Sequence, residues 1–277
     1  MSSFEKAYYE SETFWQGDAV HDEANLLRIR ETAAMLPDDV NSLTDVGCGN
    51  GVFLNHLQEQ SPRLRLLAID RSRTALKYVQ TDKLEADIAA LPLADLSHDC
   101  ITCLEVIEHL PVNAFEVALS ELTRIAKKYV ILSVPYDENL EKNHTQCPQC
   151  KSLFNLDLHF RSFSDDAIYR LLQEHDFECV STKKTGAQTS FKGHYRFEKI
   201  FYPAHFRSWR SPICPVCGYK TKEDSVQQND TIRIATNAPS PSRSLISYLT
   251  VLPKLFWPKE TTNYWIIALY RRRGSLE

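Results

Sequence analysis

Two cysteine pairs in this 277-residue chain have the spacing of metal-binding knuckles. The stretch HTQCPQC ends in Cys147 and Cys150, and CPVC places Cys214 and Cys217 in the same C-x-x-C arrangement. Together they offer four thiolates, the ligand set of a tetrahedral Zn²⁺ site, and a closed site of this kind is structural rather than catalytic. A redox pair or an iron–sulfur cluster is the alternative for these residues.

The stretch LEVIEHL carries three further residues that could do chemistry, Glu105, Glu108 and His109. Histidine titrates near neutral pH, so His109 is the leading candidate for a general base. The alternative is a histidine that packs and hydrogen-bonds beside a bound ligand. The sequence therefore predicts a catalytic or ligand-facing role for this stretch.

The turn DVGCGNG has the composition of a ligand-binding loop. Its glycines allow the backbone to turn sharply and to approach a ligand closely. The next strand ends in Asp70, whose carboxylate can accept both hydroxyls of a ribose. The spacing is G-x-G-x-G, and Val52 occupies the position of the third glycine in a dinucleotide fingerprint, so this turn is a different signature.

Strand and helix patterns alternate through the first 136 residues, which predicts an α/β fold with a doubly wound parallel sheet and helices on both faces. Helices are expected at 21–36, 74–80, 114–126 and 164–176 and in the residues that follow DVGCGNG. Strands are expected at the start of 42–57 and of 84–93, and at 63–70, 99–106, 129–135, 177–185 and 263–272.

Four motifs in register resemble those of the class I S-adenosylmethionine-dependent methyltransferases, in particular the ubiquinone O-methyltransferase group. DVGCGNG resembles the loop that holds the methionine end of the cofactor, AID ends in the ribose ligand, ADIAALPL lies at the adenine, and ITCLEVIEHL ends beside the sulfonium. Another doubly wound nucleotide-binding protein is the alternative. The resemblance implies a Rossmann-like sheet of seven strands, mostly parallel, with a reversed last strand. It implies cofactor contacts from Asp45, Gly47, Cys48, Gly49, Gly51, Asp70, Arg71, Asp87, Ile88, Leu104 and Glu105.

The same resemblance raises the question of a catalytic metal. Metal-dependent relatives hold a divalent ion with E-x-x-E-H, although metal-free relatives also carry E-H-L after the fourth strand. A metal held this way would lower the pKa of a bound hydroxyl, and Mg²⁺, Mn²⁺ or Zn²⁺ would suit mixed oxygen and nitrogen ligands. His144 or His159 could complete such a site, or replace a cysteine in the knuckles.

The resemblance also organises the chain into parts. Residues 1–34 form N-terminal cap helices, and the methyltransferase core comprises residues 35–136, 164–187 and 263–277. Residues 137–163 and 188–262 form a composite zinc-binding lid, a zinc-ribbon-like insertion. Both knuckles follow strands that end on the ligand side of the sheet, so one zinc ion would staple two loops over the acceptor. The remaining cysteines are expected to be small core residues: Cys48, Cys100, Cys103 and Cys179.

Composition bears on the partners. The net charge of −4 makes nucleic acid an unlikely partner without excluding it, yet residues 190–222 carry seven Lys and Arg residues against one Glu. This basic, aromatic segment suits a phosphorylated sugar, a nucleotide-linked sugar or a glycan, or is a solvated face. The apolar segment 244–259 could rest on a membrane surface or pack on the domain. Without a signal peptide or a long apolar run, the expected compartment is the cytoplasm, where thiols stay reduced.

These observations favour methyl transfer to an oxygen of a small-molecule or glycan-type acceptor. One alternative is a metal-dependent RNA 2′-O-methyltransferase that uses Glu105, Glu108 and His109. The other alternative is a non-catalytic protein that keeps the cofactor fold as a scaffold. The acceptor itself stays open at this point.

Overall fold

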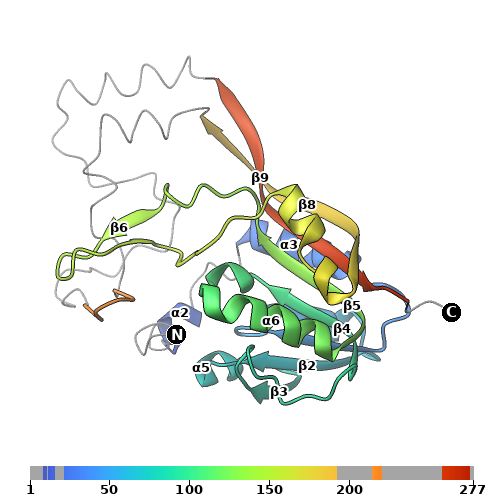
Figure 1. Cartoon of the computed structure of the whole chain (residues 1–277). Coiled ribbons are helices and arrows are strands. Elements are labelled where there is room, and N and C mark those ends of the chain that lie inside the picture. The colour runs from blue at the N-terminus through green and yellow to red at the C-terminus, as the bar shows by residue number, and fades with distance from the viewer. Residues whose placement is uncertain (1–8, 11, 16–21, 192–213, 220–257, 275–277) are drawn as a thin grey trace.

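The computed structural model describes residues 9–10, 12–15, 22–191, 214–219 and 258–274. Its main sheet has seven strands: β1 (Ser42–Val46), β2 (Arg65–Asp70), β3 (Asp82–Glu85), β4 (His98–Leu104), β5 (Ala126–Pro135), β8 (Phe177–Phe191) and β9 (Lys259–Arg272). The order is β3-β2-β1-β4-β5-β9-β8 (Figure 1). Strands β1 to β5 pair in parallel, and β9 runs antiparallel to both β5 and β8. The predicted α/β sheet with a reversed last strand is confirmed.

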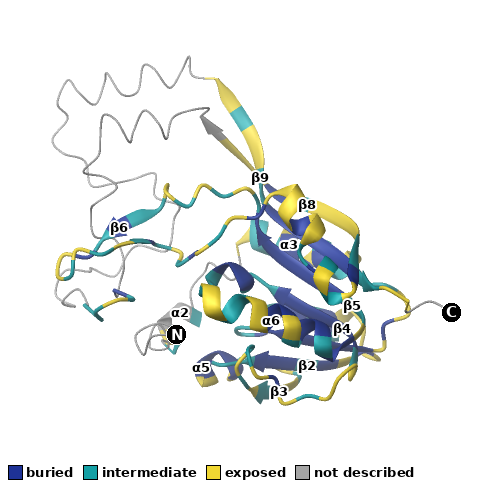
Figure 2. Cartoon of the chain, in the orientation of Figure 1, coloured by how far each residue is buried: buried dark blue, intermediate teal, exposed yellow. Residues whose placement is uncertain are grey.

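The middle of the sheet is buried on both faces. Every residue of β1 is buried, and so are the last six residues of β5 (Figure 2). Parallel strands of this kind read as continuous apolar runs because helices cover both of their faces. This burial makes the carboxyl ends of β1, β2, β4 and β5 a rigid edge from which the functional loops leave.

Helices pack on the two faces of the sheet in two apolar clusters. The described helices are α2 (Glu12–Trp15), α3 (Glu23–Ala34), α4 (Val52–Gln60), α5 (Arg73–Leu76), α6 (Val112–Ile125) and α7 (Asp165–Arg170). Ile29 of α3 and Phe53 of α4 lie in one cluster, whereas Leu119 of α6 and Ile168 of α7 lie in the other. Helix α6 covers the front of the sheet in Figure 1, and α3 lies behind it. The helices are therefore distributed as the alternating pattern predicts.

The loop after β5 differs from the sequence expectation. The sequence patterns place no helix or strand within residues 137–163, yet this segment contains a second sheet of two strands, β6 (His144–Gln146) and β7 (Leu153–Asn155). Each strand has three residues, too few for a periodic sequence signal. The hairpin places the first cysteine pair in its turn.

The last two strands extend beyond the expected core boundaries at residues 187 and 263. Strand β9 pairs with β5 only as far as Trp265, and from there to Lys259 it pairs with β8 alone. Figure 1 shows this two-stranded ribbon rising away from the rest of the sheet. Most of the basic segment 190–222 and nearly all of the apolar segment 244–259 lie outside the described residues. Among the described helices, none is long and apolar enough to cross a membrane.

Candidate functional site

The glycine turn connects β1 to α4 and requires backbone that other residues rarely adopt. Gly47, Gly49 and Gly51 all have positive φ angles, of 77°, 55° and 78°. A Cβ atom on Gly47 would lie 2.4 Å from a methyl group of Val106, and one on Gly49 would lie 2.8 Å from the ring of Trp15. Glycine is therefore required both for the turn and for the close neighbours.

Asp70 at the end of β2 lies against this turn. Its two carboxylate oxygens accept hydrogen bonds from the backbone N–H groups of Gly49, at 2.9 Å, and Ser72, at 2.7 Å. Burial raises the pKa of Asp70, and these bonds oppose the shift. A carboxylate has about four acceptor positions, so further hydroxyl groups can still bind.

Two other cofactor candidates lie deeper. Asp45 is buried on β1 and accepts a hydrogen bond of 2.6 Å from the Thr102 hydroxyl. Burial raises the pKa of Asp45 to about 7. Burial also raises the pKa of the Cys48 thiol, so this cysteine is unreactive. Cys48 and Cys179 are only partly buried, whereas Cys100 and Cys103 lie in the core as expected.

The residues assigned to the nucleoside end follow β2 and β3 at the same edge of the sheet. Asp87 is exposed and accepts a hydrogen bond from the Ala89 N–H, while Ile88 packs on the core. The Arg71 guanidinium lies 5.2 Å from the centre of the Tyr9 ring. Leu104, the last residue of β4, is partly buried. The structure thus brings the predicted cofactor residues to one edge.

Arg28 of α3 is a residue that the motifs missed. Its side chain is only 8% exposed, and its guanidinium lies 5.5 Å from the centre of the Trp265 ring. Nη2 donates to Asn25, but Nε and Nη1 have no hydrogen-bond partner in the described part of the chain. A buried guanidinium with two unused donors is suited to an anion. One sequence signal could have revealed Arg28: it is a charged residue next to Ile29, on the side of helix α3 that is buried.

The short segment before α3 was also missed. The indole N–H of Trp15 and the hydroxyl of Ser72 both donate to the backbone carbonyl of Tyr9, at 2.6 Å and 2.9 Å. The Asn50 side chain donates to the carbonyl of Trp15. This segment therefore connects the glycine turn to the residues that follow Asp70.

Glu108 and His109 lie in a 3-10 helix, Ile107–His109, that follows β4. Glu108 is fully buried, and neither of its carboxylate oxygens has a hydrogen-bond partner among the described residues, although Nε2 of His109 lies 3.9 Å from Oε1. Burial and the nearby charge of Glu105 raise the pKa of Glu108 well above its usual value. Burial, with a smaller effect of the charge of His159, lowers the pKa of His109 to about 3.

His159 reaches this site from the loop after β5. Its ring lies edge-on to the ring of His109, with 4.6 Å between the centroids, and its Nδ1 hydrogen-bonds Glu138 at 2.5 Å. Although burial opposes it, the hydrogen bond and charge of Glu138 raise the pKa of His159. Ligand atoms of Glu108, His109 and His159 all lie within 4.8 Å of one another, as a divalent ion requires.

Two sequence candidates lie outside this group. Glu105 has a positive φ of 59°, and its carboxylate accepts from Ser133, at 2.9 Å, and from the indole of Trp265, at 2.6 Å. His144 pairs with Asn155 in the small hairpin, and the described metal-ligand groups do not include it. The metal candidates at this site are therefore Glu108, His109 and His159, not the full E-x-x-E-H set, and His159 also belongs to a second, more exposed group with Glu138 and Asp157.

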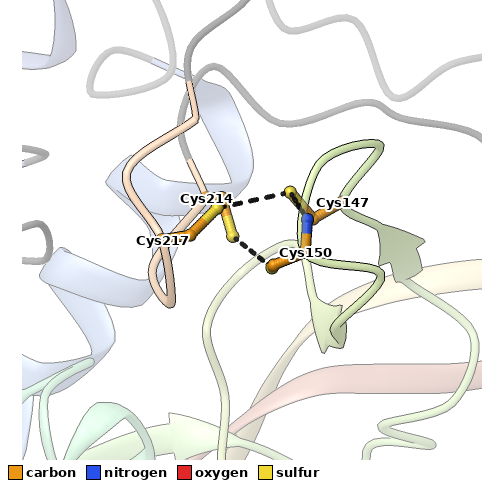
Figure 3. Close-up of side chains that lie close together, drawn as sticks. All are labelled: Cys147, Cys150, Cys214 and Cys217. Carbon is orange, nitrogen blue, oxygen red and sulfur yellow. Dashed lines mark hydrogen bonds between the residues drawn. The ribbon is translucent and has the colours of Figure 1, made fainter.

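The four predicted knuckle cysteines come together although they are far apart in sequence (Figure 3). The sulfur atoms of Cys147 and Cys217 are 3.7 Å apart, and so are those of Cys150 and Cys214. A tetrahedral ion with Zn–S bonds of about 2.3 Å places its sulfurs about 3.8 Å apart. The thiols thus fit a zinc ion.

Both knuckles have the same backbone geometry. The N–H of Cys147 bonds the carbonyl of Ser152, and the N–H of Cys214 bonds that of Tyr219, five residues on in each case. The Lys151 and Gly218 N–H groups bond back to the first cysteine of each pair. Hydrogen bonding with Ser152 lowers the pKa of the Cys150 thiol to about 6, whereas burial raises the pKa of the Cys214 thiol to about 12, so a bound cation would be needed to keep all four as thiolates. The two turns are therefore alike and face each other.

The strand order with its reversed last strand is that of the methyltransferase type of α/β fold. The chain belongs to the methyltransferase domain family, whose model matches residues 20–182. The predicted family resemblance is confirmed.

Curated relatives match a shorter stretch. A ubiquinone biosynthesis O-methyltransferase of Ralstonia nicotianae is 33% identical over 99 residues, which are 32% of this chain and 41% of that protein. The same enzyme of Leptothrix cholodnii is 32% identical over 108 residues, 35% of this chain and 44% of the relative. The match therefore spans less than half the length of these relatives.

Solved structures support the fold over nearly the whole chain. An S-adenosylmethionine-dependent methyltransferase of Thermotoga maritima aligns with a TM-score of 0.52 and 17% identity over 98% of both chains. One from Archaeoglobus fulgidus aligns with a TM-score of 0.50 and 12% identity over 92% of this chain and 97% of that one. At these identities the likeness concerns the fold alone.

Proposed function

We propose that this protein transfers the methyl group of S-adenosylmethionine to an oxygen of a small-molecule or glycan-type acceptor. The observation that carries this proposal is the contact of Asp70 with the glycine turn, at 2.9 Å, in a chain of the methyltransferase family. The similarity to ubiquinone O-methyltransferases supports oxygen as the methylated atom. The basic, aromatic segment 190–222 supports a sugar or phosphorylated acceptor.

The cofactor would be held by residues from three parts of the sheet edge. The glycine turn approaches the methionine end, Asp70 accepts the ribose hydroxyls, and Asp87 with Ile88 contacts the adenine. Arg28 supplies the cation for the carboxylate of the cofactor, which would occupy its two unused donors. Transfer from a sulfonium is an in-line displacement, so this alignment is the main contribution of the protein.

The acceptor would lie on the side of His109. Burial keeps the His109 ring neutral but lowers its pKa to about 3, so its unpartnered Nδ1 would be a weak base that takes the acceptor proton only as the methyl group is transferred. A divalent ion on Glu108, His109 and His159 is the alternative, and it would lower the pKa of the acceptor hydroxyl. The unpartnered, buried Glu108 carboxylate favours the ion, and with it a second candidate function, metal-dependent RNA 2′-O-methylation.

A structural zinc ion on the four cysteines is the second part of the proposal. It would join residues 137–163 and 188–262 as a lid on a core formed by residues 35–136, 164–187 and 263–277. A closed set of four thiolates has no open position for a reactant. Elemental analysis should find about one zinc ion per chain, lost in a Cys147→Ser, Cys214→Ser variant. Fully folded, zinc-free wild-type protein would contradict this part.

Calorimetry with S-adenosylmethionine tests the cofactor. We expect binding by the wild type and a large loss of affinity in Asp70→Ala. Absence of binding in the wild type would leave only the scaffold interpretation, whereas unchanged binding in Asp70→Ala would contradict the role of Asp70 as the ribose ligand. Transfer of a labelled methyl group to purified glycans, nucleotide sugars and RNA then shows which class of acceptor is methylated. An affinity for RNA that falls steeply with salt concentration would favour RNA as the acceptor.

A further inference from the structure

The loop that carries the first cysteine pair leaves the core and returns to it at the same place. Tyr136, just after β5, forms a parallel bridge with Phe163, and the Asp137 N–H donates to the Phe163 carbonyl at 2.9 Å. The segment between these two residues, 137–162, leaves the core and returns to it at this bridge, and we call it the excursion. Its outer end is the β6–β7 hairpin with Cys147 and Cys150 in the turn.

His159 lies at the inner end of that excursion and is connected to the hairpin by consecutive hydrogen bonds. The Leu156 N–H donates to the Asn143 carbonyl at 2.7 Å, and the Leu158 N–H donates to Asn155 at 3.0 Å. Glu138 then bonds the ring of His159. The segment that leads to His159 is thus hydrogen-bonded to the base of the hairpin, and Glu138 holds the ring itself.

The same segment is joined to the 3-10 helix that carries His109. The Phe160 N–H donates to the Glu108 carbonyl at 2.9 Å, and the Arg161 guanidinium donates to the Ile107 carbonyl at 2.5 Å. Arg161 also lies 3.9 Å from the centre of the Phe115 ring. His159 is therefore held between the hairpin on one side and the 3-10 helix on the other.

The hairpin is too small to be stable by itself. Its ladder has three residue pairs, and an isolated two-stranded hairpin is at best marginally stable in water. Cys147 and Cys214, one from each knuckle, are fully buried against their neighbours. A metal ion bound by the four thiolates would stabilise the folded hairpin, because its binding free energy adds to the free energy of folding.

We propose that the metal at the four cysteines positions His159 opposite His109, and so controls the acceptor side of the site without affecting the cofactor side. This inference rests on the proposed function, which assigns those two sides. The cofactor residues depend on the main sheet instead: Asp70 bonds the glycine turn and Ser72, and Arg28 lies on α3. A metal ion bound at the far end of the hairpin would thus set the position of His159.

The test compares two cysteine variants of the full chain. Cys150→Ser, Cys217→Ser removes the two partly buried ligands, which disturbs packing least, and Cys179→Ser is the matched control on β8, outside the cluster. Three quantities are measured: zinc content, affinity for S-adenosylmethionine by calorimetry, and the NMR signals of the histidine rings. His159→Gln assigns the ring signal of His159.

In the double variant we expect loss of zinc, an affinity for S-adenosylmethionine within about twofold of the wild type, and loss of the His159 ring N–H signal bonded to Glu138. The His109 signal should shift as well, and Cys179→Ser should match the wild type throughout. Unchanged histidine signals after loss of zinc would overturn the inference. A fall of about tenfold or more in cofactor affinity would overturn it too, because the two sides would not be separable.

If the double variant does not fold, chelation of zinc from the wild type replaces it, with recovery on addition of Zn²⁺ but not of Mg²⁺. Wild-type protein that neither contains nor takes up zinc would overturn the inference. If the wild type binds no S-adenosylmethionine, the proposed function fails, yet the response of the histidine signals to zinc is still read independently.

Discussion

His109 and His159 face each other edge to face, with 4.6 Å between ring centroids, although one follows β4 and the other follows β5. Glu108, next to His109, adds a carboxylate whose two oxygens have no hydrogen-bond partner among the described residues, with Nε2 of His109 at 3.9 Å from Oε1. An uncompensated buried acid costs several kcal/mol if it is ionised, so it is either protonated or paired with a cation. The pair of rings and this acid thus form a place for a proton or a metal ion, on the side where we propose that the acceptor binds.

Binding of Mn²⁺ distinguishes a protonated Glu108 from a Glu108 that is paired with a metal ion. We expect Glu108→Gln to weaken Mn²⁺ binding by about tenfold or more, because it removes the only carboxylate of the group of three. Glu105→Gln is the control, since its carboxylate bonds Ser133 and Trp265 instead. Electron paramagnetic resonance measures free Mn²⁺ during the titration. Equal losses in both variants would mean that the E-x-x-E-H spacing, rather than this geometry, describes the site.

Gly49→Ala should abolish cofactor binding in calorimetry. The added Cβ would lie 2.8 Å from the Trp15 ring, and the φ of 55° is unfavourable for alanine. Gly274→Ala is a matched control, because Gly274 has a φ of 75° but nothing within 4 Å of the new atom. The control should lose about 1 kcal/mol of unfolding free energy and keep full affinity. Retained affinity in Gly49→Ala would show that this turn does not approach the cofactor.

Arg28→Met should weaken binding of S-adenosylmethionine by about tenfold to hundredfold, because a charge-assisted hydrogen bond of about 1.5–3 kcal/mol is lost. The decarboxylated cofactor should bind the variant and the wild type equally. Arg30→Met, on the exposed side of the same helix, should bind both ligands as the wild type does. A variant that loses affinity for both ligands alike would indicate that Arg28 only supports the packing of Trp265.

Asp45 makes the stability of the protein depend on pH. Its folded carboxyl keeps a proton up to about pH 7, whereas the unfolded carboxyl releases it near pH 4. The folded state therefore binds more protons in this window, and the free energy of unfolding falls as the pH rises from about 4 to 7, by up to about 4 kcal/mol. Asp45→Asn should remove this contribution. Urea unfolding of both proteins at the two ends of the window measures it, and an identical pH slope would contradict the prediction.

Local motifs were enough to predict the sheet and to place the glycine turn and Asp70 at one edge of it. The glycine turn, Asp70 and the apolar strands are each defined by a few neighbouring residues, and parallel strands place their carboxyl ends together. The juxtaposition of the two cysteine pairs was also predictable, because both follow strands that end at that edge. What these predictions share is that a short stretch of chain determines each of them.

The remaining features depend on tertiary contacts that no local pattern reveals. Glu105 meets Trp265 from the last strand, and Arg28 meets the same ring from the first long helix. Tyr9 lies in a segment with no periodic signal, yet its carbonyl receives two hydrogen bonds near the site. Even His159, although a candidate, could be distinguished from His144 only by the tertiary structure, in which its ring contacts His109 while His144 pairs with Asn155 in the hairpin.

The bridge between Tyr136 and Phe163 has a consequence for how this protein could have arisen. Because the excursion starts and ends at one pair of adjacent residues, a longer or shorter segment can be exchanged there without shifting the strands on either side. The core and the excursion can then diverge at different rates, so that under the proposed function one part would keep the methyl donor while the other changes the recipient. For protein engineering, this junction is the natural place to graft the corresponding segment of a relative.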